Sequence, residues 1–221
     1  NNNTVLQNVK GTWSVFVIKT ILTIIIGVSV TLIIDPANQT TVRWNEIYTT
    51  GTIFLLSMII LPLLEEISFR MSLRFKPVYL ALSIGILSYY GITKMVYQTN
   101  LTNTDHHFNV RVLISLTTIL ITYMIVSPSK IKGHLDTFWK VHFKWIFYFF
   151  CITFAWMHIL NYELNVKHLL LLPLITLPKL VSAISYGYIR MHYGFIYSLG
   201  LHVFWNSIGF IMSLFSSVGA D

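Results

Sequence analysis

The chain has 221 residues, of which 55% are hydrophobic and only 10% are charged, and its mean hydropathy is +0.67. Soluble domains carry about 25% charged residues, so this composition excludes an ordinary soluble domain. The formal net charge is +7, but no basic run is interleaved with polar sequence, which excludes a nucleic-acid interface. We expect the basic excess to mark the cytoplasmic face of a membrane.

Apolar stretches long enough to cross a hydrocarbon core as helices of roughly 20 residues recur along the chain. They predict an all-α, polytopic transmembrane helical bundle of about seven spans, with eight as the alternative count. In chain order the spans are Trp13 to Ile34, Ile47 to Leu64, Pro77 to Gln98, Val110 to Val126, Phe143 to Leu160, Val166 to Ile189 and Phe195 to Phe215. The sixth contains Pro173 and Pro178, which remove backbone donors, so we expect it to be bent or broken.

We expect residues 1–221 to form a single membrane domain, since no internal repeat or polar domain interrupts the spans. Lysines and arginines collect beside one set of span ends, namely Lys10, Arg74, Lys76, Lys130, Lys132, Lys140, Lys144 and Arg190. The other set of ends carries fewer, namely Arg43, Lys94, Arg111 and Lys167. Because basic residues favour the cytoplasmic side, this asymmetry predicts a cytoplasmic N-terminus and an external C-terminus.

Two acidic residues stand out from the rest. Six of the eight acids lie in predicted loops or at chain ends, namely Asp35, Glu46, Asp105, Asp136, Glu163 and Asp221. Glu65 and Glu66 instead continue the apolar run that ends at Leu64. An acidic side chain in hydrocarbon costs at least about 2.5 kcal/mol, and adjacent carboxylates repel each other. Glu65, Glu66 and the nearby Arg70 are therefore the charges that need a structural or chemical explanation.

Helical spacing separates the two acids. Glu66 and Arg70 are four residues apart and face the same side of a helix, so they can form an ion pair. Glu65 is rotated about 100° away and has no basic residue three or four positions later. We therefore expect Glu66 to be structural and Glu65 to serve chemistry, because burial beside a second carboxylate makes a stronger general base. The alternative is two acids at a frayed cytoplasmic helix end.

Two further spans carry histidines in apolar surroundings. His158 shares a helix face with Phe154, and His202 shares one with Asn206. A lone intramembrane histidine is more often a hydrogen-bonded packing residue than a catalyst. Counted from the predicted cytoplasmic ends at 1.5 Å per residue, Glu65, His158 and His202 lie at depths of about 15, 21 and 12 Å. This common layer predicts one water-activating site.

The three motifs Glu65-Glu66-x-x-x-Arg70, Phe154-x-x-x-His158 and His202-x-x-x-Asn206, in this order on apolar helices, resemble the signature of the CPBP family. This family comprises the CAAX proteases and bacteriocin-processing proteins, and is similar to the type II CAAX prenyl endopeptidases. The resemblance covers a family-like core at about 61–209. It departs from the family between the first two motifs, where the chain has room for an inserted pair of spans at about 77–126.

The resemblance implies an intramembrane endopeptidase of the bacterial cell membrane, with membrane lipid and a membrane-associated peptide or protein substrate as partners. By this resemblance Glu65 activates a water for attack on a peptide carbonyl, and His158 positions that water or assists proton transfer. His202 and Asn206 donate hydrogen bonds to the oxyanion. The supporting residues are Glu66, Arg70 and Phe154.

No cofactor is favoured. Glu65, His158 and His202 could ligate zinc with an open fourth position, but the chain has no His-Glu-x-x-His helix, and Asn206 suits oxyanion donation better than ligation. A noncatalytic immunity or scaffold protein of the same family is an alternative that does not need this combination of residues. A proton-coupled transporter would also bury Glu and His, although the chain is short and lacks an inverted repeat. The oligomeric state is left open.

Overall fold

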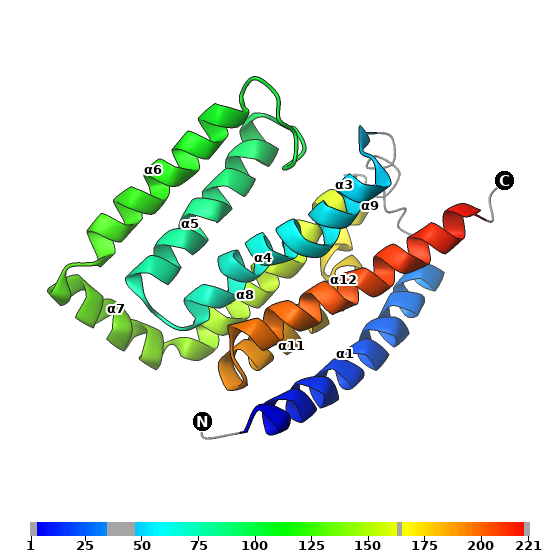
Figure 1. Ribbon diagram of the computed structural model, residues 1–221, viewed down its shortest axis with the longest axis horizontal. Helices are drawn as coiled ribbons and strands as arrows, with labels where there is room; N and C mark the ends of the chain where they lie inside the picture. The colour runs from blue at the N-terminus through cyan, green and yellow to red at the C-terminus, as the bar shows by residue number, and fades with distance from the viewer. Residues whose placement is uncertain (1–3, 35–46, 163–164, 219–221) are drawn as a thin grey trace. The chain divides into compact units, whose positions relative to one another are not determined.

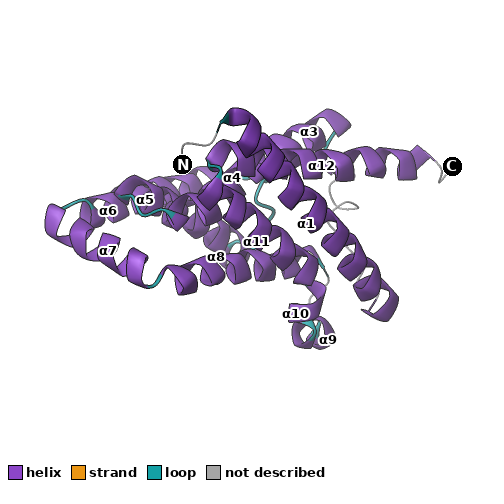
Figure 2. Ribbon diagram, turned by 90° about the horizontal axis from the view of Figure 1, so that it is seen from below, coloured by secondary structure: helices purple, strands orange, loops and turns teal. Residues whose placement is uncertain are grey.

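The computed structural model describes residues 4–34, 47–162 and 165–218, and its elements within these ranges are helices (Figure 2). Six helical segments of the described chain are long and apolar enough to cross a membrane: Val5–Ile34, Thr50–Leu73, Pro77–Val96, Phe108–Val126, Phe143–Asn161 and Phe195–Phe215. The predicted class, an all-α polytopic membrane protein, is confirmed. Five charges assigned above to loops or ends lie outside the described residues: Asp35, Arg43, Glu46, Glu163 and Asp221.

Contacts between residues divide the chain into two compact units. The first unit consists of Asn1–Pro62 and Phe147–Asp221, and the second of Leu63–Ile146. The divisions fall inside two helices, α4 (Leu61–Arg70) and α8 (Phe143–Met157). The predicted pair of inserted spans belongs to the second unit. The single domain and the insertion stay predictions.

The first unit is built on α1 (Val5–Ile34), which packs against α11 (Leu177–His192) and α12 (Phe195–Val218). A short turn joins α11 to α12 (Figure 1). Gly194 in this turn has a φ of +115°, a conformation that glycine adopts readily and other residues rarely do. The buried core between the three helices consists of Phe16, Tyr186, Ile189 and Leu201. This hairpin holds the predicted residues His202 and Asn206 against the rest of the unit.

Two irregular helical turns flank the other elements of the first unit. The short helix α3 (Thr50–Leu55) begins at Thr49, whose hydroxyl caps the backbone N–H of Thr52, and it continues into a π-helical turn, Leu56–Ile60, that packs on α12. At the end of α8 the chain tightens into a 3₁₀ turn, His158–Asn161. A second core cluster, Ile34, Ile159 and Ile175, fixes this turn. Both turns carry residues next to the predicted motifs.

The predicted sixth span, Val166 to Ile189, is broken into shorter helices. The structure divides this stretch into α9 (Val166–Leu170), α10 (Leu172–Ile175) and α11. Pro173 and Pro178 occupy the first turns of α10 and α11, where a proline needs no backbone hydrogen. The expected break is therefore present, and the described chain has six membrane-length helices instead of seven because none of the three pieces is long enough.

The second unit centres on the antiparallel pair α5 (Pro77–Gly91) and α6 (Phe108–Val126), which Figure 1 shows side by side. The helices approach closely at Gly85, where any Cβ would collide with the Ile119 side chain. The Ser115 hydroxyl donates a hydrogen bond to the Gly85 carbonyl at 2.8 Å. The outward side chains of α6 are largely apolar, as contact with lipid requires, and include Leu113, Leu116, Leu120 and Met124.

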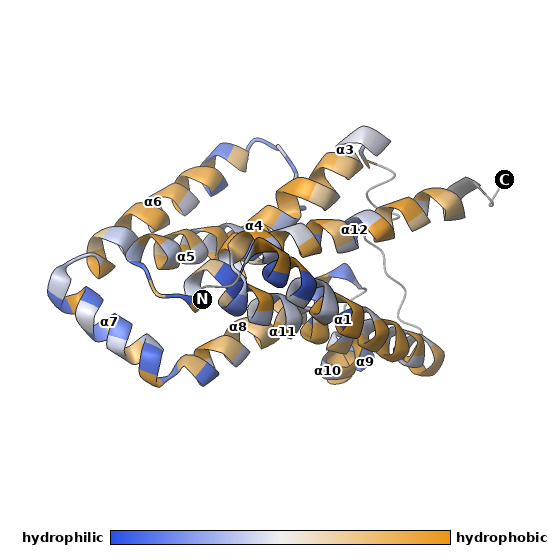
Figure 3. Ribbon diagram, turned by 60° about the horizontal axis from the view of Figure 1, so that its bottom comes forward, coloured by the Kyte–Doolittle hydropathy of each residue, from blue (hydrophilic) through white to orange (hydrophobic). Residues whose placement is uncertain are grey.

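The segment after α6 forms a helix that the sequence did not predict. Lys130, Lys132 and Lys140 mark a charged connection, but the chain folds into α7 (Ser129–Val141). Figure 3 shows hydrophilic and hydrophobic residues interspersed along α7, whereas α6 is mostly hydrophobic. The indole N–H of Trp139 donates to the Ser72 carbonyl at 2.7 Å, just after α4. This bond ties α7 to the helix that carries Glu65 and Glu66.

Candidate functional site

The two predicted histidines contact one aromatic ring in the first unit. Phe154 lies on α8 and is 3% exposed. Its ring centroid is 4.6 Å from the His158 ring and 6.3 Å from the His202 ring, which meets it nearly at right angles. The structure therefore brings Phe154, His158 and His202 together, although 43 residues lie between the two histidines in the sequence. Phe154 forms the wall that both imidazoles share.

A backbone hydrogen bond orients His158. Its Nδ1 lies 2.8 Å from the Phe154 carbonyl oxygen, at the point where α8 gives way to the 3₁₀ turn. A carbonyl oxygen only accepts, so Nδ1 carries the hydrogen, and the lone pair of the neutral ring is on Nε2. The side chain is partly exposed. His158 is thus oriented to present Nε2 to a water or a proton donor.

His202 and Asn206 lie one turn apart on α12 and make different contacts. His202 is 5% exposed, and its ring stacks on Tyr186 with centroids 4.8 Å apart and planes at 21°. Asn206 donates a hydrogen bond from Nδ2 to the Ser57 carbonyl at 2.9 Å. Ser57 belongs to the π-helical turn, a feature that recurs at functional sites. Because an amide nitrogen has two hydrogens, this bond uses one of them and orients the other.

The acidic motif belongs to the second unit. Glu66 is fully buried and Arg70 is 2% exposed, and Arg70 Nε lies 3.5 Å from Glu66 Oε1. The predicted ion pair is therefore present. Glu65 is partly exposed and interacts electrostatically with Tyr90 on α5, which is 6% exposed. The two carboxylates occupy different surroundings, as their helical spacing predicts.

Two buried side chains near the candidate residues were missed by sequence reasoning. The Tyr90 hydroxyl has no hydrogen-bond partner among the described residues. Nothing in the sequence distinguishes Tyr90 from the other tyrosines of this aromatic chain. Lys19 is 1% exposed in the middle of α1. Its signal was available, because a lysine well inside the first predicted span is an intramembrane charge in the same sense as Glu65.

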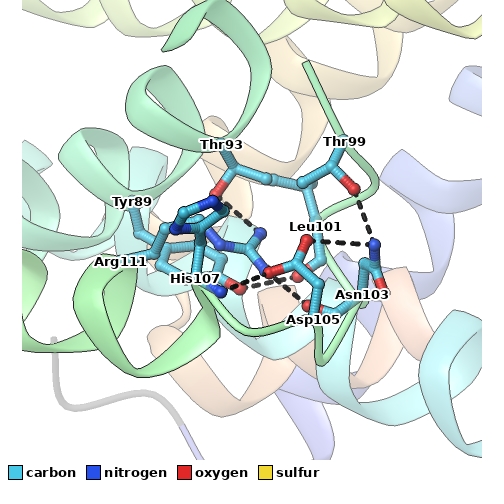
Figure 4. A network of polar contacts seen from close by, with 8 residues as sticks. All are labelled: Tyr89, Thr93, Thr99, Leu101, Asn103, Asp105, His107 and Arg111. Atoms are coloured by element: carbon cyan, nitrogen blue, oxygen red, sulfur yellow. Dashed lines mark hydrogen bonds and ion pairs between the residues drawn. The ribbon is translucent and has the colours of Figure 1, made fainter. Parts of the chain in front are cut away.

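Arg111 also differs from expectation. The sequence placed it at a span end, but its side chain is fully buried in the second unit. Its Nη2 donates to the Asn103 carbonyl at 2.5 Å and to Asp105 Oδ1 at 3.2 Å, while Nη1 is 3.4 Å from the Thr93 hydroxyl. Figure 4 shows this network, in which Asp105 also accepts from the backbone N–H of His107. Asp105, assigned to a simple loop, therefore anchors that loop to α6.

The donor groups of the described residues bear on metal ligation. The described residues contain no group of three or more His, Cys, Asp or Glu side chains placed to hold a metal ion. Glu65 belongs to the second unit and His158 and His202 to the first, so the zinc alternative stays a prediction. Comparisons with protein-family models, curated proteins and solved structures found no match for this chain.

Proposed function

We propose that the protein is an intramembrane endopeptidase that hydrolyses a peptide bond of a membrane-associated protein or peptide. The supporting observation is that His158 and His202 contact the same Phe154 ring. Two imidazoles directed to one buried ring form a polar site inside apolar helices, which packing alone does not require. The orientation of His158 by the Phe154 carbonyl adds the fixed Nε2 that acid-base chemistry needs.

In the proposed reaction Glu65 takes a proton from a water, and the water oxygen attacks the peptide carbonyl carbon. His158 orients that water through Nε2, and the proton taken up by Glu65 passes by way of Nε2 to the leaving amine nitrogen as the C–N bond breaks, which returns both groups to their starting states. His202 and Asn206 donate hydrogen bonds to the negatively charged oxygen of the tetrahedral intermediate. Glu65 belongs to the second unit, so its place in this reaction rests on the three-motif resemblance and the predicted common depth.

The remaining motif residues have supporting roles in this proposal. The buried Glu66–Arg70 ion pair fixes the helix that carries Glu65, and Phe154 fixes the spacing of the histidines. The reaction uses glutamate and imidazole groups and no metal. A bacterial cell membrane as the location, with the N-terminus in the cytoplasm, is part of the same proposal, since the basic span ends favour that orientation.

The direct test reconstitutes the purified protein into phosphatidylethanolamine and phosphatidylglycerol vesicles with a panel of labelled membrane peptides. The panel contains single-span peptides, leader peptides and peptides with a prenylated C-terminus. Glu65→Gln should lower cleavage at least about 1,000-fold without lowering the unfolding midpoint, because it removes only the general base. Glu66→Gln is the matched neighbour, and should lower the unfolding midpoint because it removes the buried ion pair.

Robust cleavage by the Glu65→Gln variant would refute the assigned base. Loss of wild-type cleavage with a chelator, restored by zinc, would replace the metal-free reaction with a zinc-dependent one. A noncatalytic binding protein or a transporter would leave every peptide intact, and a transporter would also dissipate a proton gradient across the vesicles. Labelling of the segment Lys130 to Lys144 from outside intact cells would reverse the proposed orientation.

A further inference from the structure

Lys19 is a buried cation that the proposed reaction leaves unexplained. It lies in the membrane-length helix α1, is 1% exposed, and its Nζ has no hydrogen-bond partner among the described residues. The described ion pairs do not include it. Lys179 of α11 is a second basic residue that interacts with it electrostatically. Within the part of the chain that the structure describes, no carboxylate is therefore paired with this buried lysine.

Aromatic rings surround the amine instead. The Lys19 Nζ is 3.2 Å from the ring centroid of Trp205, 5.3 Å from that of Tyr186 and 5.6 Å from that of Phe16. These three rings come from three different helices of the first unit, α12, α11 and α1. The negative face of an aromatic ring attracts a cation, most strongly for tryptophan and when water is excluded. We call Lys19, Phe16, Tyr186 and Trp205 the lysine box.

Stability alone does not account for the lysine box. A charged amine moved out of water loses its hydration, and ring faces replace only part of it. An unbranched apolar side chain such as methionine would fill the same space without that penalty. Charged residues are rare inside membrane helices, and those that occur mark functional positions by default. The lysine box is therefore expected to serve the neighbouring chemistry.

The lysine box contacts His202 through the Tyr186 ring. The Tyr186 ring that receives the Lys19 cation is also the ring on which the His202 imidazole stacks, 4.8 Å away. Trp205, the ring nearest to Nζ, lies three residues after His202 on the same helix. Any shift of the Tyr186 plane therefore changes the surface that supports the imidazole. One side chain, Tyr186, therefore separates the Lys19 amine from His202, the residue assigned to oxyanion binding.

We propose that Lys19 is a positioning residue for His202, acting through Tyr186 and Trp205. Its cation holds the two ring faces toward Nζ and thereby fixes the imidazole plane. It transfers no proton and touches no substrate. The catalytic meaning of this inference rests on the proposed peptidase function, but the positioning itself is a property of the fold and can be measured without any substrate.

The test compares Lys19→Met, which keeps the shape and removes the cation, with Lys19→Arg, which keeps the cation. Lys10→Met is the matched control, because it makes the same substitution at an exposed position of the same helix. Three quantities are measured in detergent micelles: the unfolding midpoint, the cleavage constants kcat and KM on the peptide panel, and the ring resonances of His202 in histidine-labelled protein. His202→Gln assigns the resonances.

Lys19→Met should lower kcat about tenfold with KM nearly unchanged, since one cation–π contact is of that size. It should keep or slightly raise the wild-type unfolding midpoint and shift or broaden the His202 resonances. Lys19→Arg should restore most of both properties, and Lys10→Met should change neither.

Wild-type His202 resonances in Lys19→Met would overturn the proposal. A lowered midpoint in Lys19→Met that Lys19→Arg restores, without restoring the His202 resonances, would also overturn it by assigning Lys19 to stability alone. If wild-type protein cleaves no peptide, the peptidase proposal fails, and the resonance comparison still decides the role of Lys19. If Lys19→Met does not fold, the same comparison is made with Lys19→Arg and Tyr186→Leu. The proposal then requires wild-type resonances only in the arginine variant.

Discussion

The two units bury cations in opposite ways. In the second unit, Arg111 is fully buried and donates to a carboxylate, a carbonyl and a hydroxyl within one network. In the first unit, Lys19 is almost as deeply buried and faces three aromatic rings, with no hydrogen-bond acceptor among the residues that the structure describes. A guanidinium matched to acceptors stabilises the loop it holds, whereas an amine held only by ring faces is costly to keep. The comparison indicates a structural role for Arg111 and agrees with the functional role proposed for Lys19.

This contrast predicts how removal of a buried charge changes stability. The loss of stability should be larger when more polar partners, and more deeply buried ones, are left without that charge. Three substitutions of buried charges test this prediction, and a fourth, of the neutral donor Trp139, gives the size of one hydrogen bond for comparison. All four are measured by equilibrium unfolding in mixed micelles with circular dichroism. The charges run from one with a fully buried partner to one with no polar partner in the described structure. Reversal of their order would break the comparison between the two units.

Glu66→Gln should have the largest effect, a destabilisation of about 3 kcal/mol, because it leaves the Arg70 cation buried opposite a neutral group. Arg70 is only 2% exposed, so water cannot readily replace the lost carboxylate. Glu66→Gln with Arg70→Gln provides the matched double variant, and should be less destabilised than the sum of the single changes. Additive effects would show that the pair contributes nothing.

Arg111→Met should destabilise the protein by about 2 kcal/mol, because its hydrogen bonds to Asn103 and Asp105 are lost. The effect is smaller than for Glu66→Gln, since the Asp105 side chain is 24% exposed and can be hydrated after the change. The His107 amide donates a hydrogen bond to Asp105, and its hydrogen exchange should become faster. Unchanged exchange there would contradict the anchoring role of the network.

Trp139→Phe should cost about 1 kcal/mol, the usual net value of one hydrogen bond. The change removes the indole donor to the Ser72 carbonyl but keeps an aromatic ring beside Phe75, whose centroid lies 5.2 Å from that of Trp139. Trp145→Phe is the control, because Trp145 is 74% exposed and should tolerate the change. Equal losses in the two variants would show that the bond to Ser72 is not what stabilises α7.

Lys19→Met should have the smallest effect, between no change and a gain of about 1 kcal/mol, since it removes a buried charge and leaves no polar group behind. This is the sharpest test of the comparison, because Arg111→Met is the same kind of change with the opposite expected result. A loss as large as that of Arg111→Met would place Lys19 with the structural cations.

Local rules predicted what depends on one helix. The Glu66–Arg70 ion pair follows from four-residue spacing, and the shared face of Phe154 and His158 follows from the same spacing. Most membrane helices follow from the length of their apolar stretches. The break in the sixth predicted span also follows from a local rule, since Pro173 and Pro178 each lie in the first turn of a new helix.

Tertiary contacts decided the rest. Arg111 was assigned to a membrane edge because its position in the chain is a span end, and only the fold of residues 99–105 over it explains its burial. The helix α7 escaped prediction because its charges suggested a connection. Tyr90 and the lysine box depend on which helices pack together, and no periodicity in the sequence gives that information.

Phe154 has a consequence for how the protein can vary. Because both histidines contact its ring, substitutions at His158 and His202 are not independent events, and a double variant should depart from additivity. A lineage that changed one imidazole would alter the selection acting on the other through the shared ring. Phe154 itself would then be the most constrained of the three positions, even though it takes no part in the proposed reaction.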